Sequence, residues 1–102
     1  MKERSLWITR LRATNNAKRV VNAAGGKLFV FGSALTHESP RDLDLLLVYD
    51  DNRITAGEAC AGRSTLRAAL KRFSVPMEIC LLSAREAESS NFVEKECCRS
   101  VW

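Results

Sequence analysis

Proline and glycine are sparse in this sequence, and long apolar runs are missing from it. Two prolines and five glycines in 102 residues exclude collagen-like and low-complexity chains. No apolar run approaches the roughly 18 residues that a membrane-spanning helix requires. The opening residues Met-Lys-Glu-Arg-Ser lack the apolar stretch of a secretory signal, so we expect a cytoplasmic protein without a membrane anchor.

Histidine and paired cysteines are also scarce. The single histidine is His37, and the four cysteines, Cys60, Cys80, Cys97 and Cys98, form no CxxC pair. This spacing predicts neither a zinc finger nor a zinc ribbon, and in a reducing compartment it predicts free thiols, with Cys80 as a small core residue. His37 is either a phosphate or base contact or an ordinary exposed loop residue, and its residue type favours the second interpretation.

The residues that are present have the composition of one small globular domain. The chain is 46% hydrophobic and 27% charged, as in an ordinary soluble domain. We therefore predict a single domain over residues 1–102, which buries about two thirds of the surface of its unfolded chain. A substrate lid or a second lobe would have to come from another chain.

The net charge of +4 is unevenly distributed along the chain. Residues 1–31 carry seven basic groups and one acidic group, residues 32–54 carry two and five, and residues 55–102 carry seven and six. The basic first third is either the solvated face of a helix, which is the simpler interpretation, or a phosphate-binding patch. The acidic middle third needs a different explanation, because its carboxylates lie within an apolar run.

Hydrophobic periodicity and turn residues predict an alternation of helices and strands. Apolar residues at spacings of three and four predict helices, and short apolar runs between turn residues predict strands. In chain order we expect a helix over 5–24, a strand over 27–31, a turn or short helix over 34–41, a strand over 42–50, a helix over 55–73, a strand over 75–82 and a helical region from Ser83 that includes Phe92, Val93, Cys97 and Val101. Capping boxes at Thr55–Glu58 and Ser83–Glu86 begin the last two helices. The order predicts an α/β (α+β) fold in which helices cover a mixed sheet of at least three strands.

Acidic residues at the start of the 42–50 strand are the first candidate site. Asp42 and Asp44 share one face of that strand, about 6.5 Å apart along the backbone. Two carboxylates at the start of a core strand repel each other, so a pair of Mg²⁺ ions would suit them. Glu78 is the only charge in the next strand and would be a third carboxylate if the two strands are neighbours. The plainer alternative is a solvated strand end, with Asp42 and Asp44 paired to Arg41 and with Glu78 guarding a sheet edge.

A glycine and a serine follow the first predicted strand. Gly32 permits a tight turn and a close approach of the backbone to a ligand, and Ser33 at the start of a helical turn can hold a phosphate. The dipeptide alone is weak evidence. Its place in an ordered series, before Asp-x-Asp on one strand and an acid on the next, is much more specific.

At these residues the sequence resembles the DNA polymerase β-type nucleotidyltransferase superfamily, and within it the minimal nucleotidyltransferases. The segments that carry the resemblance are Phe29–Ala34, Asp42–Val48 and Met77–Leu81, and it extends over about residues 5–95. It implies a palm-like nucleotidyltransferase fold.

The resemblance also implies roles for five residues. Gly32 and Ser33 would contact nucleotide phosphates, and Asp42, Asp44 and Glu78 would bind two Mg²⁺ ions and carry catalysis. The implied reaction is transfer of a nucleoside monophosphate, AMP from ATP, to a hydroxyl acceptor. Small members of the family often belong to toxin–antitoxin modules, so the implied acceptor lies on a small helical partner of the HEPN type, and a homodimer is the other expected assembly.

Two departures from the family pattern support a different class of function. The spacer between Ser33 and Asp42 is short, and the third acid is Glu where the family commonly has Asp. Both features suit a catalytically inactive module that masks a partner protein. A weaker third hypothesis is nucleic-acid binding through the basic first helix.

Overall fold

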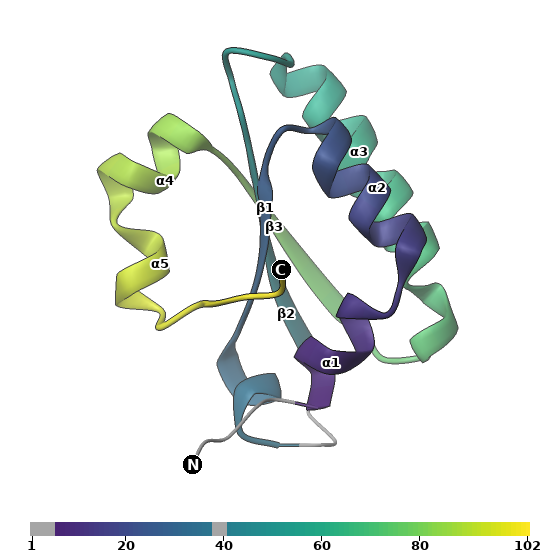
Figure 1. Ribbon diagram of the computed structural model, residues 1–102. Helices are drawn as coiled ribbons and strands as arrows, with labels where there is room; N and C mark the ends of the chain where they lie inside the picture. The colour runs from purple at the N-terminus through teal and green to yellow at the C-terminus, as the bar shows by residue number, and fades with distance from the viewer. Residues whose placement is uncertain (1–5, 38–40) are drawn as a thin grey trace.

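A mixed sheet of four strands organises the fold (Figure 1). The computed structural model describes residues 6–37 and 41–102. Its elements are α1 (Leu6–Arg12), α2 (Asn15–Ala23), β1 (Lys27–Phe31), the 3₁₀ helix η1 (Gly32–Leu35), β2 (Leu43–Tyr49), α3 (Ala56–Ala69), the 3₁₀ helix η2 (Lys71–Phe73), β3 (Met77–Ser83), α4 (Ala84–Ser90), α5 (Phe92–Lys95) and β4 (Arg99–Ser100). The predicted mixed α/β architecture with at least three strands is confirmed.

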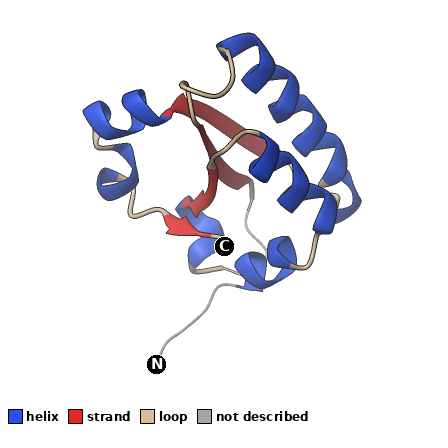
Figure 2. Ribbon diagram, turned by 45° about the horizontal axis from the view of Figure 1, so that its top comes forward, coloured by secondary structure: helices blue, strands red, loops and turns tan. Residues whose placement is uncertain are grey.

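The strands lie in the order β3-β2-β1-β4. β1 runs antiparallel to both β2 and β4, whereas β2 and β3 are parallel and are connected through α3. Helices α1, α2 and α3 lie on one face of the sheet, and α4 and α5 lie on the other (Figures 1 and 2). Within the described residues, every helix is too short or too polar to cross a bilayer.

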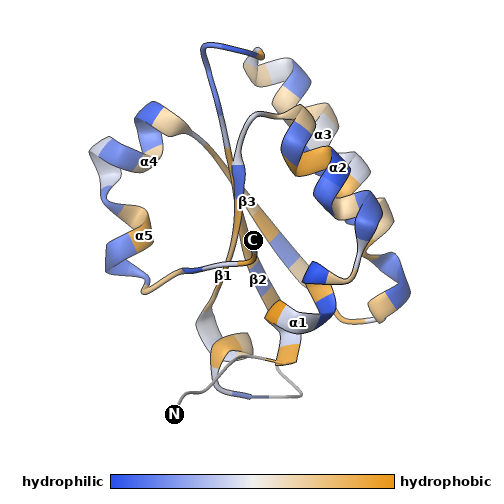
Figure 3. Ribbon diagram, in the orientation of Figure 1, coloured by the Kyte–Doolittle hydropathy of each residue, from blue (hydrophilic) through white to orange (hydrophobic). Residues whose placement is uncertain are grey.

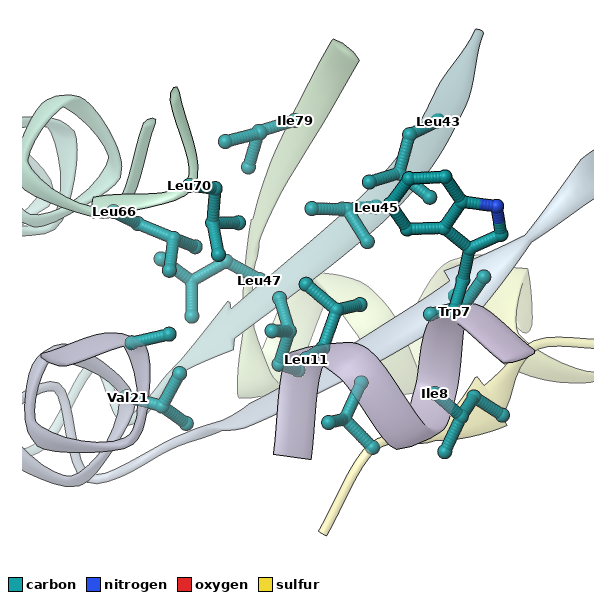
Figure 4. Close-up of a cluster of buried hydrophobic side chains, with 14 of the residues drawn as sticks. Trp7, Ile8, Leu11, Val21, Leu43, Leu45, Leu47, Leu66, Leu70 and Ile79 are labelled. Carbon is teal, nitrogen blue, oxygen red and sulfur yellow. The ribbon is translucent and has the colours of Figure 1, made fainter. Parts of the chain in front are cut away.

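The main core fills the space between the sheet and the α1–α3 layer (Figure 4). Alternate residues of β2, Leu43, Leu45 and Leu47, point into it and are fully buried. They meet Leu11 from α1 and Leu66 from α3. Burial of each such leucine stabilises the fold by roughly 1.5–3 kcal/mol. Figure 3, coloured by hydropathy, shows hydrophobic and hydrophilic residues alternating along α2 and α3.

The predicted helix over 5–24 is wrong in one respect, because the structure divides it into α1 and α2. At the break, Thr14 has extended dihedral angles (φ −95°, ψ 96°), and its hydroxyl donates to the carbonyl of Arg10 at 3.2 Å. Two asparagines with low helix propensity follow it. The change of direction lets Trp7 of α1 and Val21 of α2 both reach the same core.

The predicted helical region from Ser83 is also wrong in its last part. Asn91, with φ 59°, separates α4 from α5, and Cys97, with φ 54°, ends the helical backbone. The chain then forms β4, in which Arg99 and Ser100 pair with β1, and the Val101 amide donates to the Leu28 carbonyl at 2.9 Å. This return covers the outer edge of β1, which would otherwise expose unpaired backbone groups.

Most other element boundaries agree with the sequence. β1 occupies the predicted residues 27–31, and Gly25 ends α2 with φ 63°, a left-handed conformation that favours glycine. Both capping boxes form: Thr55 and Ser83 each accept from the amide three residues later, and Glu58 and Glu86 reciprocate. The second strand begins one residue later than predicted, so that Asp42 lies just outside it, and β3 covers 77–83 in place of 75–82. Trp7 of α1 belongs to the core and is 2% exposed.

Candidate functional site

Strand directions bring the three segments of interest to one end of the sheet. Because β1 and β2 are antiparallel, the end of β1 meets the start of β2, and Phe31 is the register partner of Asp44. Because β2 and β3 are parallel, the start of β3 meets the start of β2, and Glu78 is the register partner of Asp44. The strand of Glu78 therefore lies beside the strand of Asp44, as a third carboxylate at this site requires.

Asp44 and Glu78 project from the same face of the sheet. Side chains at one register position of neighbouring strands point the same way, and the strands are about 4.8 Å apart. This is the face that carries α4 and α5, opposite to the leucine core. Asp42 lies in the bend before β2, near enough for its charge to act on Asp44. Asp44 is half-buried, whereas Asp42 and Glu78 are exposed.

The electrostatics of this acidic group are unfavourable in the protein alone. Burial raises the pKa of Asp44, and the negative charges of Asp42 and Glu78 raise it further. In the described part of the chain the side-chain ion pair is that of Arg85 with Asp51, at 3.8 Å, so no cation neutralises the three acids there. A bound cation would relieve both the burial and the repulsion.

Gly32 has no side chain and so leaves room for the Asp44 carboxylate. Its φ of +77° lies in the left-handed region, and a Cβ atom at this position would come within 2.5 Å of Asp44 Oδ2. Any side chain here would therefore displace the carboxylate. Ser33, the next residue, is half-buried in the turn of η1, and its carbonyl accepts from the amides of Thr36 (3.1 Å) and His37 (2.9 Å). The predicted pair Gly32-Ser33 thus lies directly beside the acids.

The donor set suits a hard divalent cation, since carboxylate oxygens are the ligands that Mg²⁺ prefers. The oxygens do not converge, however: among residues 6–37 and 41–102 there is no group of three His, Cys, Asp or Glu side chains positioned to hold one ion. The side chains of Asp42 and Glu78 are exposed and have room to turn toward a bound ion. Asp42, Asp44 and Glu78 are the residues that could hold a metal.

Other residues singled out by the sequence lie at the margin of this site. His37 and Arg41 are exposed, and residues 38–40 of the predicted 34–41 turn lie outside the described residues. All four cysteines are free, as predicted. Cys80 is not a core residue, since it is only half-buried, on the same face as Glu78. Burial, followed by the charges of Glu78 and Asp44, raises the pKa of its thiol.

A cavity of about 440 Å³ lies on the same face of the sheet, and sequence reasoning missed it. It is bounded by Phe29 and Val48 of the sheet and by Ala87 and Val93 of the α4–α5 layer. Val48 is near the end of β2 whereas Asp44 is near its start, so the cavity and the acids are separate. No sequence signal could have found it, because it depends on how α4 and α5 pack over the sheet.

Comparison of the chain with models of known protein families, with curated proteins and with solved structures finds no match. The geometry of the acidic group and of the turn beside it therefore carries the functional argument.

Proposed function

We propose that this protein is a Mg²⁺-dependent nucleotidyltransferase with a palm-like fold, which transfers AMP from ATP to a hydroxyl group. The observation that carries the proposal is the register pairing of Asp44 with Glu78, with Gly32 against the Asp44 carboxylate. Three segments distant in the sequence meet there, which supports the function that the resemblance to nucleotidyltransferases suggests.

Each residue of the site has a role in this reaction. Asp42, Asp44 and Glu78 would hold two Mg²⁺ ions, which would supply positive charge to a bound ATP. Gly32 and Ser33 line the turn that receives the nucleotide phosphates, since glycine lets the backbone approach closely. The acceptor oxygen attacks the α-phosphorus and pyrophosphate leaves. Glu78, the most exposed position of the register pair, is suited to take the proton of the attacking hydroxyl.

The acceptor in this proposal is a side chain of a partner protein. Leu6 and Trp102 are large apolar side chains that remain exposed, at 38% and 37%, and could contribute to a protein interface. A small helical protein of the HEPN type, as in toxin–antitoxin modules, is the partner that the resemblance suggests, and a second copy of the chain is the other candidate. ATP and Mg²⁺ are both abundant in the cytoplasm, where we place the protein.

Calorimetry with a non-hydrolysable ATP analogue tests the proposal. We expect binding that requires Mg²⁺ and that is lost in Asp42→Asn and Asp44→Asn. Asp51→Asn is the matched control, because Asp51 is an exposed aspartate in the turn after β2, at the other end of that strand. Binding that persists in both site variants, or that Mg²⁺ does not affect, would contradict the assignment.

A second candidate function is a non-catalytic module that masks its partner. It is favoured by the lack of convergence of the three carboxylates on one point in the described residues. Mass spectrometry of the co-expressed partner separates the candidates: an enzyme adds one AMP unit, and Asp44→Asn abolishes the addition. A partner that stays unmodified yet is inhibited equally by wild type and Asp44→Asn would indicate masking.

A further inference from the structure

Charge is segregated between the two faces of the sheet. The layer formed by α1, α2, α3 and η2 carries eight basic residues and one acidic residue, Glu58, whereas α4 and α5 carry two basic residues and three acidic ones. The three site carboxylates add further negative charge on the α4–α5 side. One face of this small protein is therefore strongly cationic, and the cations come from elements far apart in the sequence.

Five of the exposed cations of this layer lie on α1, α2 and η2. Helices α2 and α3 run antiparallel, so the start of α2 lies near the end of α3, and α1 crosses this same end (Figure 1). We name these five residues the basic helical face: Arg10, Lys18, Arg19, Lys71 and Arg72. Glu58 lies at the opposite end of α3, roughly 20 Å from Lys71 along the helix, and its carboxylate is engaged with the Thr55 amide.

Aromatic rings fix two of these cations in place. The Arg10 guanidinium lies over the Trp7 ring, 4.8 Å from its centre, and the Arg72 guanidinium lies over the Phe73 ring at 5.2 Å. The two rings meet edge to face, with centres 5.7 Å apart, which connects α1 to η2. Both guanidinium groups are thereby held on one surface before any ligand arrives, which lowers the entropic cost of binding.

The chemistry of the face selects a particular kind of ligand. The ion pair in the described part of the chain lies elsewhere, between Arg85 and Asp51, so these five cations have no acidic partner there. The rings of Trp7 and Phe73 pack toward the core and are not available to stack on unpaired bases, as binding of a single strand commonly requires. What the face presents is a set of positive charges for regularly spaced phosphates.

We propose that the basic helical face binds the phosphodiester backbone of a double-stranded nucleic acid, on the side of the sheet opposite to the carboxylates. The geometry and the charges of α1–η2 carry this inference, and it does not depend on nucleotidyl transfer. The negative charge of the α4–α5 side orients the protein so that its acidic face points away from the duplex.

Fluorescence anisotropy with labelled 20-base-pair RNA and DNA duplexes of arbitrary sequence tests the inference. If five phosphates are neutralised, the slope of log affinity against log salt is about −4.5, a loss of several hundred-fold between 50 and 200 mM salt. The double variant Arg19→Glu, Lys71→Glu should shift the slope by about two toward zero. Both side chains are exposed and make no ring contact, so the fold should persist, which circular dichroism verifies.

The matched control is Arg85→Glu with Lys95→Glu, which changes the net charge by the same amount on the α4–α5 side. It should leave the slope unchanged. Failure of wild type to bind either duplex at 50 mM salt, or equal losses in the two double variants, would overturn the proposal. Displacement of the duplex by polyglutamate at equal charge concentration would also overturn it, because that result indicates a surface for acidic proteins. Asp44→Asn should bind the duplex as wild type does. A failure of the duplex-binding proposal can therefore be distinguished from a failure of the proposed nucleotidyltransferase activity.

Discussion

Asp44 and Glu78 lie at the same register position of two neighbouring parallel strands, and both are acids on one face of the sheet. Like charges directly across two neighbouring strands destabilise a sheet. The folded protein keeps this unfavourable pair together, which is the expected behaviour of a site that serves a ligand. Two predictions concern this acidic group, one concerns the edge of β3 and one concerns the cysteine thiols.

Asp44→Asn should stabilise the protein in the absence of divalent cations. The pKa of Asp44 is raised in the folded state, so the folded state holds the proton more tightly than the unfolded state does. The stability from this group is present below the ordinary pKa of 3.8 and is lost as the pH rises through the raised value. At pH 7.5 the Asn variant should therefore have a higher free energy of unfolding than wild type, measured with urea.

The gain from Asp44→Asn should shrink below pH 3.8, where wild type is protonated as well. If the acids bind Mg²⁺ as proposed, the gain should also shrink in Mg²⁺, because the ion would then stabilise wild type and not the variant. Asp51→Asn, at the opposite end of β2, serves as the control. A variant less stable than wild type at pH 7.5 without Mg²⁺ would disprove the view that these acids repel each other.

Gly32→Ala should both destabilise the protein and weaken any binding at the acids. The left-handed φ of +77° costs a residue with a side chain about 1–2 kcal/mol, and the new Cβ collides with Asp44 Oδ2. Gly57→Ala in α3 is the control, because the only neighbour of its Cβ is Thr55 Oγ1 at 3.8 Å and its φ is not left-handed. Thermal unfolding of the two variants, with and without Mg²⁺, makes the comparison. Equal melting temperatures for the two would refute the role of Gly32.

Arg63→Ala combined with Arg67→Ala should increase self-association. β3 is an edge strand, and the Met77 and Ile79 carbonyls point away from β2. Arg67 Nη1 donates to the Met77 carbonyl at 3.1 Å, and Arg63 Nη1 approaches the Ile79 carbonyl at 3.5 Å. Loss of both arginines leaves these acceptors open to another strand.

Sedimentation velocity over a range of concentrations measures the effect of the two arginines on the β3 edge. Arg19→Ala with Lys71→Ala removes the same charge from exposed positions away from β3 and should leave the oligomeric state unchanged. An arginine double variant that sediments as wild type does at every concentration would show that side-chain bonding is not what protects this edge.

Alkylation should divide the four thiols into two classes. Cys60 and Cys97 are exposed, whereas Cys80 and Cys98 are half-buried. Burial, together with the nearby Glu96 charge, raises the pKa of Cys98 from 9.0 to about 11, which lowers its thiolate fraction about a hundredfold at neutral pH. Mass spectrometry during iodoacetamide treatment should find Cys60 and Cys97 modified first. In urea the four rates should converge, and a Cys98 that reacts fastest in the native protein would contradict its buried position.

Much of the local structure was predictable because local chemistry determines it. The bounds of β1 follow from an apolar run between Gly25-Gly26 and Gly32, and the starts of α3 and α4 follow from capping boxes whose hydrogen bonds join residues three apart. The break at Thr14 was not predictable from periodicity, because Trp7 and Val21 fit the same helical stripe whether or not the helix bends. Tertiary packing decides between those possibilities.

The residues of the candidate site were predictable from the sequence, but the order of the strands that brings them together was not. The alternation of side chains along a strand predicted that Asp42 and Asp44 share a face, although Asp42 lies in the bend before β2. No sequence pattern could establish that β3 lies beside β2. The contact between Gly32 and Asp44 is a relation between strands as well, and it emerges from the antiparallel pairing of β1 with β2. β4 was missed because two residues are too few to show any periodicity.

The return of the chain at β4 has a kinetic consequence for folding. β1 is synthesised well before β4, so its outer edge stays unpaired until Arg99 and Ser100 follow from the ribosome. Throughout that interval the apolar Lys27–Phe31 segment offers a free backbone edge to any other nascent chain. Closure of this edge is therefore a late event, and variants that weaken β4 should lower the yield of soluble protein by more than their effect on equilibrium stability explains.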